Sequence, residues 1–373
     1  MPEHIDDGTS IYLRSTPIPR ALESVQQAFT GMYPRNKRTD KFGRPIIVTR
    51  TLTDETLYPN EGNCQRLAQL RFAFGERAAQ RWNESKEMDY LNGLMSKWMP
   101  ETSPRVAVNS KPRLTGIADT INSTLAHGPL TKLPKEFYDP TALGIIDRIV
   151  VEEWFGGYQE SAEYRQLGIG PLAGDIVTRM TRSLSRNHDN YSEDRINKGG
   201  PRYGKKDGED RLRFALSGCH DSTIAAILSS LGAFKGERWP PYTSYVAFEL
   251  FREKKDQEDL AARNNSRNAN QQRDEQPFQP LNYLSTLFGK SKDYPPSIDR
   301  TRSSDLKPEQ KEQMNGYFVR VRYNDRVMKV PGCAAAGHHL PGNASFCTLV
   351  SLFYQLITYV ASSLRRAHSN NCN

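Results

Sequence analysis

The sequence has little of what marks several common classes of protein. Its five cysteines form no CxxC pair and have no zinc-site spacing to histidine, so we expect no metal. The first ten residues, MPEHIDDGTS, include acids and no apolar core, which is unlike a signal peptide. No internal repeat is visible. We therefore favour an intracellular location, in the cytoplasm or a mitochondrion, over secretion.

A convincing membrane span is also lacking. Residues 347–364 carry no charge but contain Ser, Thr and Gln repeatedly, so they predict a packed terminal helix in preference to a tail anchor. We expect no stable membrane insertion. Hydrophobic residues make up 37% of the chain and the mean hydropathy is −0.69, which indicates polar insertions in an ordinary core. The net charge of +8 favours anionic partners without choosing among them.

What is present is organised around one strand-turn-helix stretch. Residues 212–216 alternate as in a short strand, and residues 224–231 carry an apolar helix face that Gly232 would close. His220 and Asp221 fall at the turn between them, where ligands bind in open α/β sheets and where a helix N-terminus favours an anion. The simpler alternative is that Asp221 caps the helix and His220 is a loop residue.

A second strand-to-helix unit stands near the start of the chain. Residues 11–13 are apolar, and the Ser-Thr-Pro-Ile-Pro run after them marks the beginning of a helix. Arg20 falls in the first turn of that helix, where the helix dipole disfavours a cation, so it is a candidate functional residue. The alternative is an arginine that reaches into solvent.

The pattern divides the chain into an α/β core, a helical cap and a polar insertion. We expect the core at residues 1–59 and 211–352, the cap and a polar loop at 60–210, a disordered insertion at 252–315 and an atypical tail at 353–373. The insertion is charged but lacks the interleaved aromatics of a nucleic-acid platform, so we expect no nucleic-acid partner. Further strands are predicted at residues 45–52, 245–251, 317–323 and 326–330.

Several blocks together resemble one family. They are RSTPIPRALESVQQAFTGMYP at residues 14–34, GIGPLAGDI at 168–176, HDSTIAAILSSLG at 220–232, ERWPPYTSYVAFELF at 237–251 and PGCAAAGHHLPGNASFC at 331–347. In these blocks the chain is similar to the histidine acid phosphatases of the phosphoglycerate-mutase-like superfamily. ETLYPNEGNC and the WPP segment most resemble the lysophosphatidic acid phosphatase (type 6) branch.

The resemblance implies a fold, an activity and roles for named residues. The fold would be a three-layer α/β/α sandwich with an inserted helical cap. The activity would be a metal-independent and cofactor-free phosphomonoesterase, acting on small phosphate monoesters, with lysophosphatidate as one candidate. Arg20 would hold phosphoryl oxygens, His220 would donate to the phosphoryl group, and Asp221 would protonate the leaving oxygen. The matching cysteines of the family imply a Cys333–Cys347 disulfide.

One departure from the family concerns the nucleophile. In the family, a histidine in an N-terminal RHGxRxP motif attacks phosphorus, and no such motif occurs in this sequence. We therefore expect a chain that is N-terminally incomplete, that contains no nucleophile and that is inactive as written. The family's first strand, central in its sheet, would also be missing, which would leave two unpaired strand edges.

Two other functions are weighed against this one. The first is a non-catalytic protein that binds phosphate or lipid through Arg20 and His220. The second is a thiol hydrolase that uses Cys219 and His220. The second is disfavoured because neighbouring side chains on an extended segment point to opposite faces. No oligomeric state is predicted.

Overall fold

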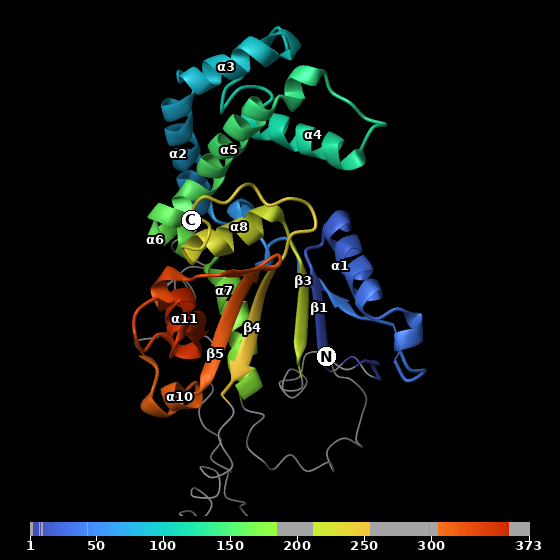
Figure 1. Cartoon of the computed structure of the whole chain (residues 1–373), viewed down its shortest axis with the longest axis vertical. Helices are drawn as coiled ribbons and strands as arrows, with labels where there is room; N and C mark the ends of the chain where they lie inside the picture. The colour runs from blue at the N-terminus through green and yellow to red at the C-terminus, as the bar shows by residue number, and fades with distance from the viewer. Residues whose placement is uncertain are drawn as a thin grey trace, which may run out of the picture.

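The computed structural model describes residues 3–184 except 7, 9 and 43, residues 212–253, residue 298 and residues 305–357. These residues form both strands and helices, so the chain is an α/β protein, as predicted. Figure 1 shows the strands in the lower half of the molecule and the cap helices α3, α4 and α5 above the ends of strands β1 and β3.

The first sheet is parallel and contains β1 (Ile11–Ser15), β2 (Ile47–Val48) and β3 (Phe214–Gly218), in the order β2-β1-β3. Ile11 pairs with Phe214 and Ser15 with Gly218, so β1 and β3 end at the same level. The helices that follow them, α1 (Pro19–Met32) and α8 (Asp221–Ser230), therefore begin at one edge of the sheet. This register positions the two units singled out in the sequence.

The second sheet is antiparallel, with the strand order β4-β5-β8-β7 and β6 paired to β5. The predicted hairpin is confirmed, whereas the last two strands were not predicted because their polar sequences carry little strand signal. The strands are β4 (Val246–Arg252), β5 (Tyr317–Tyr323), β6 (Arg326–Met328), β7 (His339–Leu340) and β8 (Asn343–Thr348). Cys333 and Cys347 form a disulfide with Cα atoms 5.4 Å apart.

Strands β3 and β4 are each the outer strand of a sheet among the described residues. Within the described residues, β3 pairs with β1 alone and β4 pairs with β5 alone. Both edges carry backbone N–H and C=O groups that could pair with another strand.

The helical cap has a hydrophobic core of its own. Its long helices are α2 (Gln65–Trp82), α3 (Lys86–Met95), α4 (Leu114–His127) and α5 (Pro140–Glu160). Met88, Leu91 and Ile117 are buried in the cap cluster. Helices α2 and α5 also extend into the larger cluster of the α/β core, where Leu67 and Phe155 are buried. The cap is therefore joined to the core by two continuous helices.

The predicted cap boundary at residue 210 needs a correction. Helices α6 (Ala162–Gly168) and α7 (Gly170–Arg182) bury their apolar side chains in the cluster of the α/β core, among them Leu172 and Val177. Helix α7 packs against the C-terminal helix α11 (Leu349–Ile357). Sequence periodicity identifies a helix but not the layer it joins, which explains the difference.

Two further boundaries are corrected near the C-terminus. Most of the predicted insertion 252–315 lies outside the described residues. Its last part is ordered, since α10 (Pro308–Gln313) is followed by the buried Met314. The predicted tail begins inside α11, where Phe353 and Leu356 are buried in the core. No helix among the described residues is long and apolar enough to cross a membrane.

Short 3-10 turns complete the fold. They are η1 (Arg35–Lys37), η2 (Glu61–Asn63), η3 (Ser96–Trp98), η4 (Lys135–Tyr138) and η9 (Pro331–Cys333).

A buried ion-pair network ties β1 to the loop before α2 and to α7. The Arg14 guanidinium donates to Asp175 Oδ2 at 2.9 Å and to Glu55 Oε1 at 2.5 Å. Glu55 also accepts from the backbone N–H groups of Thr56 and Leu57. The Arg14 and Glu55 side chains are completely buried, at 0% exposure each. The network fixes the loop that leads to Tyr58, a residue of the pocket described below.

Candidate active site

The candidate site lies where β1 and β3 end. Pro19 occupies the first turn of α1, where its missing N–H costs nothing, and Arg20 follows it as an exposed side chain. After β3, His220 has extended backbone angles and stands immediately before α8. Gly232, with φ of +70°, follows the helix as predicted.

Gly218 allows β3 and α1 to approach each other closely. A Cβ atom at this position would lie 2.6 Å from the backbone oxygen of Ala21 and in collision with Val25 Cγ2. Gly218→Ala should therefore destabilise the fold by roughly 1–3 kcal/mol, because the clash includes backbone that cannot rotate away. Urea unfolding measures this. Gly31→Ala is the matched control on α1, since a Cβ there meets nothing within 4 Å. It should be neutral or stabilising. Equal behaviour of the two variants would contradict the close contact.

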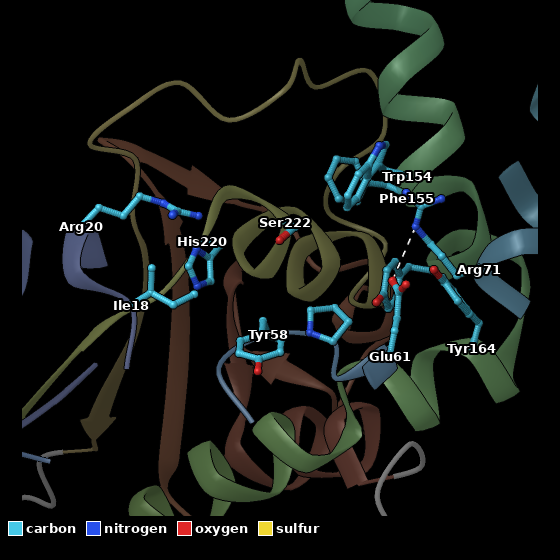
Figure 2. Close-up of a pocket in the computed structure, with 12 residues that line it drawn as sticks. Ile18, Arg20, Tyr58, Glu61, Arg71, Trp154, Phe155, Tyr164, His220 and Ser222 are labelled. Atoms are coloured by element: carbon cyan, nitrogen blue, oxygen red, sulfur yellow. Dashed lines mark ion pairs between the residues drawn. The ribbon is translucent and has the colours of Figure 1, made fainter. Parts of the chain in front are cut away.

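One cavity of about 230 Å³, open to solvent, is lined by residues of both predicted units and of the cap helices. Figure 2 shows Arg20 and His220 at one end, Tyr58 and Ser222 in the middle, and Glu61, Arg71 and Trp154 at the other end. Arg20 and His220, from the two strand-to-helix units, both line this cavity. The other lining residues are Ile18, Pro59, Phe155, Tyr158 and Tyr164.

His220 is held by residues of two other segments. Its Nε2 lies 3.2 Å from Thr16 Oγ1, and the Tyr58 ring meets it edge-on with ring centroids 6.0 Å apart. The pKa of His220 is lowered, first because burial disfavours the imidazolium and second because the Arg20 guanidinium repels it. Asp221 acts in the opposite direction. A neutral imidazole next to an arginine leaves room for an anion between them.

The titration of His220 tests this arrangement. We expect its midpoint below the ordinary value of 6.5, and we expect Arg20→Gln to raise the midpoint by removing a repelling charge. The Cε1–H resonance, assigned with His220→Gln, reports the midpoint by NMR. Arg35→Gln is the matched control, because Arg35 is an exposed cation outside the pocket. A midpoint that Arg20→Gln leaves unchanged would mean that the two side chains do not interact.

Asp221 lies beside His220 but faces a different partner. Its Oδ2 accepts a hydrogen bond from the Trp239 indole N–H at 2.7 Å, and its Oδ1 accepts from the backbone N–H of Ser222. The Trp239 backbone N–H in turn donates to Asp147 of α5. Sequence reasoning noted the WPP segment as a family signal and missed this contact. An indole donor near the His-Asp turn could not be inferred without the fold.

The far end of the cavity combines aromatic rings with charge. The Arg71 guanidinium stacks 4.0 Å from the centre of the Trp154 ring. It lies 3.6 Å from a Glu61 oxygen and 3.9 Å from a Glu153 oxygen. Burial raises the pKa of Glu61, and Arg71 partly opposes that shift. The Arg71 cation therefore lies near two carboxylates, of which Glu153 accepts a closer hydrogen bond from Arg113 at 2.5 Å.

The remaining candidates are not part of this constellation. Burial raises the pKa of Cys219 to about 11, so its thiol stays protonated, which argues further against a thiol hydrolase. Of the histidines in the described part of the chain, His220 alone lines the pocket, while His338 and His339 bond to Ser351 and to the Cys333 carbonyl. Across the described ranges, no group of three His, Cys, Asp or Glu side chains could hold a metal ion.

The chain is similar to a known protein family and to several known proteins. The family model for the histidine phosphatase superfamily (branch 2) matches residues 1–268. A probable acid phosphatase of Schizosaccharomyces pombe is 36% identical over 349 residues, which is 94% of this chain and 66% of the relative. Testicular acid phosphatase of Mus musculus is 26% identical over 248 residues, covering 64% of this chain and 51% of the relative.

Two further proteins are more distant. Counting factor 60 of Dictyostelium discoideum is 22% identical over 261 residues, 68% of this chain and 52% of that protein. A Hafnia alvei phytase bound to tartrate has a TM-score of 0.46 at 10% identity, covering 95% of this chain and 80% of the phytase. The chain spans between half and just under two thirds of the length of these curated relatives.

Proposed function

We propose that this chain, which belongs to the histidine phosphatase superfamily (branch 2), forms the phosphate-binding and proton-donating part of a phosphomonoesterase site. The observation that carries the proposal is the convergence of Arg20 and His220 on one cavity at the N-terminus of α8. Asp221 follows His220 in the chain outside the residues that line the cavity, and its carboxylate accepts a hydrogen bond from Trp239. The acid phosphatases among its relatives support the same reaction class.

The geometry suits phosphoryl transfer. Negative charge spreads over the phosphoryl oxygens in the transition state, and preplaced donors stabilise it. Arg20 supplies a fixed positive charge, His220 supplies an N–H donor, and the α8 N-terminus adds the positive end of a helix dipole. The leaving alkoxide needs a positioned acid, a role that Asp221 fits.

The nucleophile is the part that this chain does not supply in the scheme. The family attacks phosphorus with the histidine of an RHGxRxP motif, which the printed sequence does not contain. A segment with that motif could pair with the open edge of β3 or of β4, which would place its histidine near the ends of the strands. The alternative is a protein that binds phosphate without hydrolysing its esters. Measuring ester hydrolysis by the chain joined to a segment that carries the motif would distinguish the phosphatase from the phosphate-binding protein.

The sequence motifs suggest a narrower substrate class than the names of the relatives do. The ETLYPNEGNC and WPP segments suggest lysophosphatidate, while the relatives compared above are named as acid phosphatases or as a counting factor. We retain small phosphate monoesters as the proposed class and treat lysophosphatidate as a candidate within it.

Phosphate binding tests the proposal without requiring turnover. Titration calorimetry of the chain with inorganic phosphate should show one site, and Arg20→Gln should weaken binding by about 10- to 150-fold, the value of a charged hydrogen bond of roughly 1.5–3 kcal/mol. Arg35→Gln should bind like the parent, because Arg35 lies outside the pocket. If Arg20→Gln and Arg35→Gln bind phosphate equally well, Arg20 is not a phosphate ligand and the proposed site is wrong.

A further inference from the structure

Asp221 lies on an exposed turn, where a carboxylate can point in several directions. It is the first residue of α8 and is exposed, whereas its neighbours His220 and Ser222 line the cavity. Its Oδ1 accepts from the backbone N–H of Ser222, which is a contact within its own turn. That contact does not tie the carboxylate to the rest of the fold. A general acid, however, must be held in a fixed direction relative to the oxygen that it protonates.

A second contact ties the carboxylate to a distant segment. The Trp239 indole N–H, 18 residues further along the chain, donates to Asp221 Oδ2 at 2.7 Å. An indole N–H is a donor only, so it suits a carboxylate oxygen. Resting on the proposed function, in which Asp221 is the acid, we infer that Trp239 is a positioning residue. It orients the Asp221 carboxyl group for protonation of the leaving oxygen, and the cap orients Trp239.

The indole of Trp239 is held by the cap helix α5. Its ring packs against Trp154 with centroids 5.7 Å apart and against Phe155 with centroids 5.0 Å apart. Phe155 is 1% exposed, so it forms a fixed surface. The backbone N–H of Trp239 donates to Asp147 Oδ1 of the same helix at 2.9 Å. Because both its ring and its backbone contact α5, the indole N–H has a set direction.

The segment that carries Trp239 also contacts a second cap helix. The Tyr242 hydroxyl lies 3.2 Å from Ser123 Oγ of α4. Figure 1 shows the segment between α8 and β4 passing between α8 and the cap helices. The direction of the acid therefore depends on the cap, although Asp221 itself belongs to the α/β core.

Trp239 also contributes to packing, and the test must separate the two roles. The residue is half-buried and packs against both large hydrophobic clusters. Trp239→Phe keeps an aromatic ring and removes the N–H donor. Trp82→Phe is the matched control, because Trp82 is buried in the cap cluster and its indole N–H has no hydrogen-bond partner among the described residues. The difference between the two variants reports the hydrogen bond.

The contact is tested first on the chain as printed. The indole N–H resonance of Trp239, assigned by its loss in Trp239→Phe, should shift in proton–nitrogen NMR spectra of Asp221→Asn. The reason is that an amide oxygen is a weaker acceptor than a carboxylate oxygen. The indole resonance of Trp82 should stay in place. An unchanged Trp239 resonance would mean that the indole does not bond to Asp221 in solution, which overturns the inference.

The role in catalysis is tested in the extended protein, which is this chain joined to a segment that carries RHGxRxP. An alkoxide needs a proton as it leaves, whereas nitrophenolate leaves with less help. Trp239→Phe should therefore lower kcat/KM for glycerol phosphate about 10- to 100-fold more than kcat/KM for p-nitrophenyl phosphate, the range that a displaced acid costs. Trp82→Phe should leave the ratio of the two kcat/KM values unchanged.

Asp147 provides an independent variant with a conservative rescue. Asp147→Ala removes the acceptor of the Trp239 backbone N–H and should show the same selective loss for glycerol phosphate. Asp147→Asn keeps an oxygen acceptor and should bring the ratio of the two kcat/KM values back toward that of the parent.

Each kinetic outcome has a separate meaning. Equal losses for the two esters in Trp239→Phe would make Trp239 a structural residue, which overturns the inference and leaves the proposed function standing. A selective loss in Trp82→Phe as well would also overturn it, because that variant removes no hydrogen bond to the acid. Absence of turnover by the extended protein without any substitution would overturn the proposed phosphatase itself and, with it, the role of an acid.

Discussion

No measurable hydrolysis of p-nitrophenyl phosphate at acidic pH is expected from the purified 373-residue chain. Loss of a nucleophile in a well-studied protease lowers kcat by a factor on the order of 10⁶. The sequence lacks RHGxRxP, and its two arginines would also be missing from the phosphate contacts. Charge-assisted contacts of that kind are each worth about 1.5–3 kcal/mol.

His220 cannot replace the missing histidine. It is adjacent to Asp221 at the start of α8, and in-line displacement needs the attacking and leaving groups on opposite sides of phosphorus. A nucleophile at His220 would stand on the same side as the acid. His338 and His339, the other histidines of the core, are bonded to residues away from the pocket.

Joining a segment that carries RHGxRxP to the start of this chain should give turnover, and Asp221→Ala in the extended protein should remove most of it again. Arg35→Gln in the extended protein is the control for an ordinary surface change. Robust turnover by the printed chain that vanishes on His220→Ala would reverse our assignment of the attacking histidine. Failure of the extended protein to hydrolyse the ester while still binding phosphate would favour the non-catalytic alternative.

Arg14→Met should destabilise the protein by about 3–5 kcal/mol, the usual cost of removing one partner from a buried ion pair. The Arg14 guanidinium is completely buried and forms ion pairs with Glu55 and Asp175. Its loss would leave two buried carboxylates without the positive charge that offsets their desolvation. Arg50, which lies 3.0 Å from Asp175 but is 30% exposed, compensates only part of it. The free energy of unfolding from urea denaturation is the measurement.

A matched control separates burial from the mere loss of an ion pair. Arg66 forms a two-pronged contact with Glu163 at 2.8 Å for each hydrogen bond, but both side chains are nearly half exposed. Arg66→Met should therefore have a small effect, because water screens such pairs. The combination of Arg14→Met with Glu55→Gln and Asp175→Asn should recover part of the lost stability. If Arg14→Met costs no more than Arg66→Met, the network is not what stabilises the loop before α2.

Local sequence was enough to predict the two strand-to-helix units and the residues at their turns. The alternation of 212–216 and the proline run before Arg20 are signals that lie within a few residues, so no tertiary information was needed. That His220 and Arg20 share a pocket depends on the parallel pairing of β1 with β3, a non-local contact that the structure shows.

The parts that could not be predicted depend on distant contacts. Thr16 and Trp239 reach His220 and Asp221 from other segments, and neither belongs to a local motif for that contact. In the sequence, Arg71 has no feature that distinguishes it from other residues of its helix. Its contacts with Trp154 and Glu61 are visible only in the fold. The layer that α7 joins was missed for the same reason, since its amphipathic face fits a cap or a core equally well.

The pairing of β1 with β3 has a consequence for how the protein folds. Ile11 meets Phe214 across a loop that contains the whole cap, so closing it has an entropic cost and the contact is highly non-local. The contacts between the cap helices α2 and α5 close shorter loops, such as the 83-residue separation of Arg77 and Glu160, so we expect them to form earlier. Arg20 and His220 come close to each other only when β1 pairs with β3. We therefore expect the phosphate site that they form to appear late in folding. A folding intermediate with a formed cap would therefore contain helix but no phosphate site.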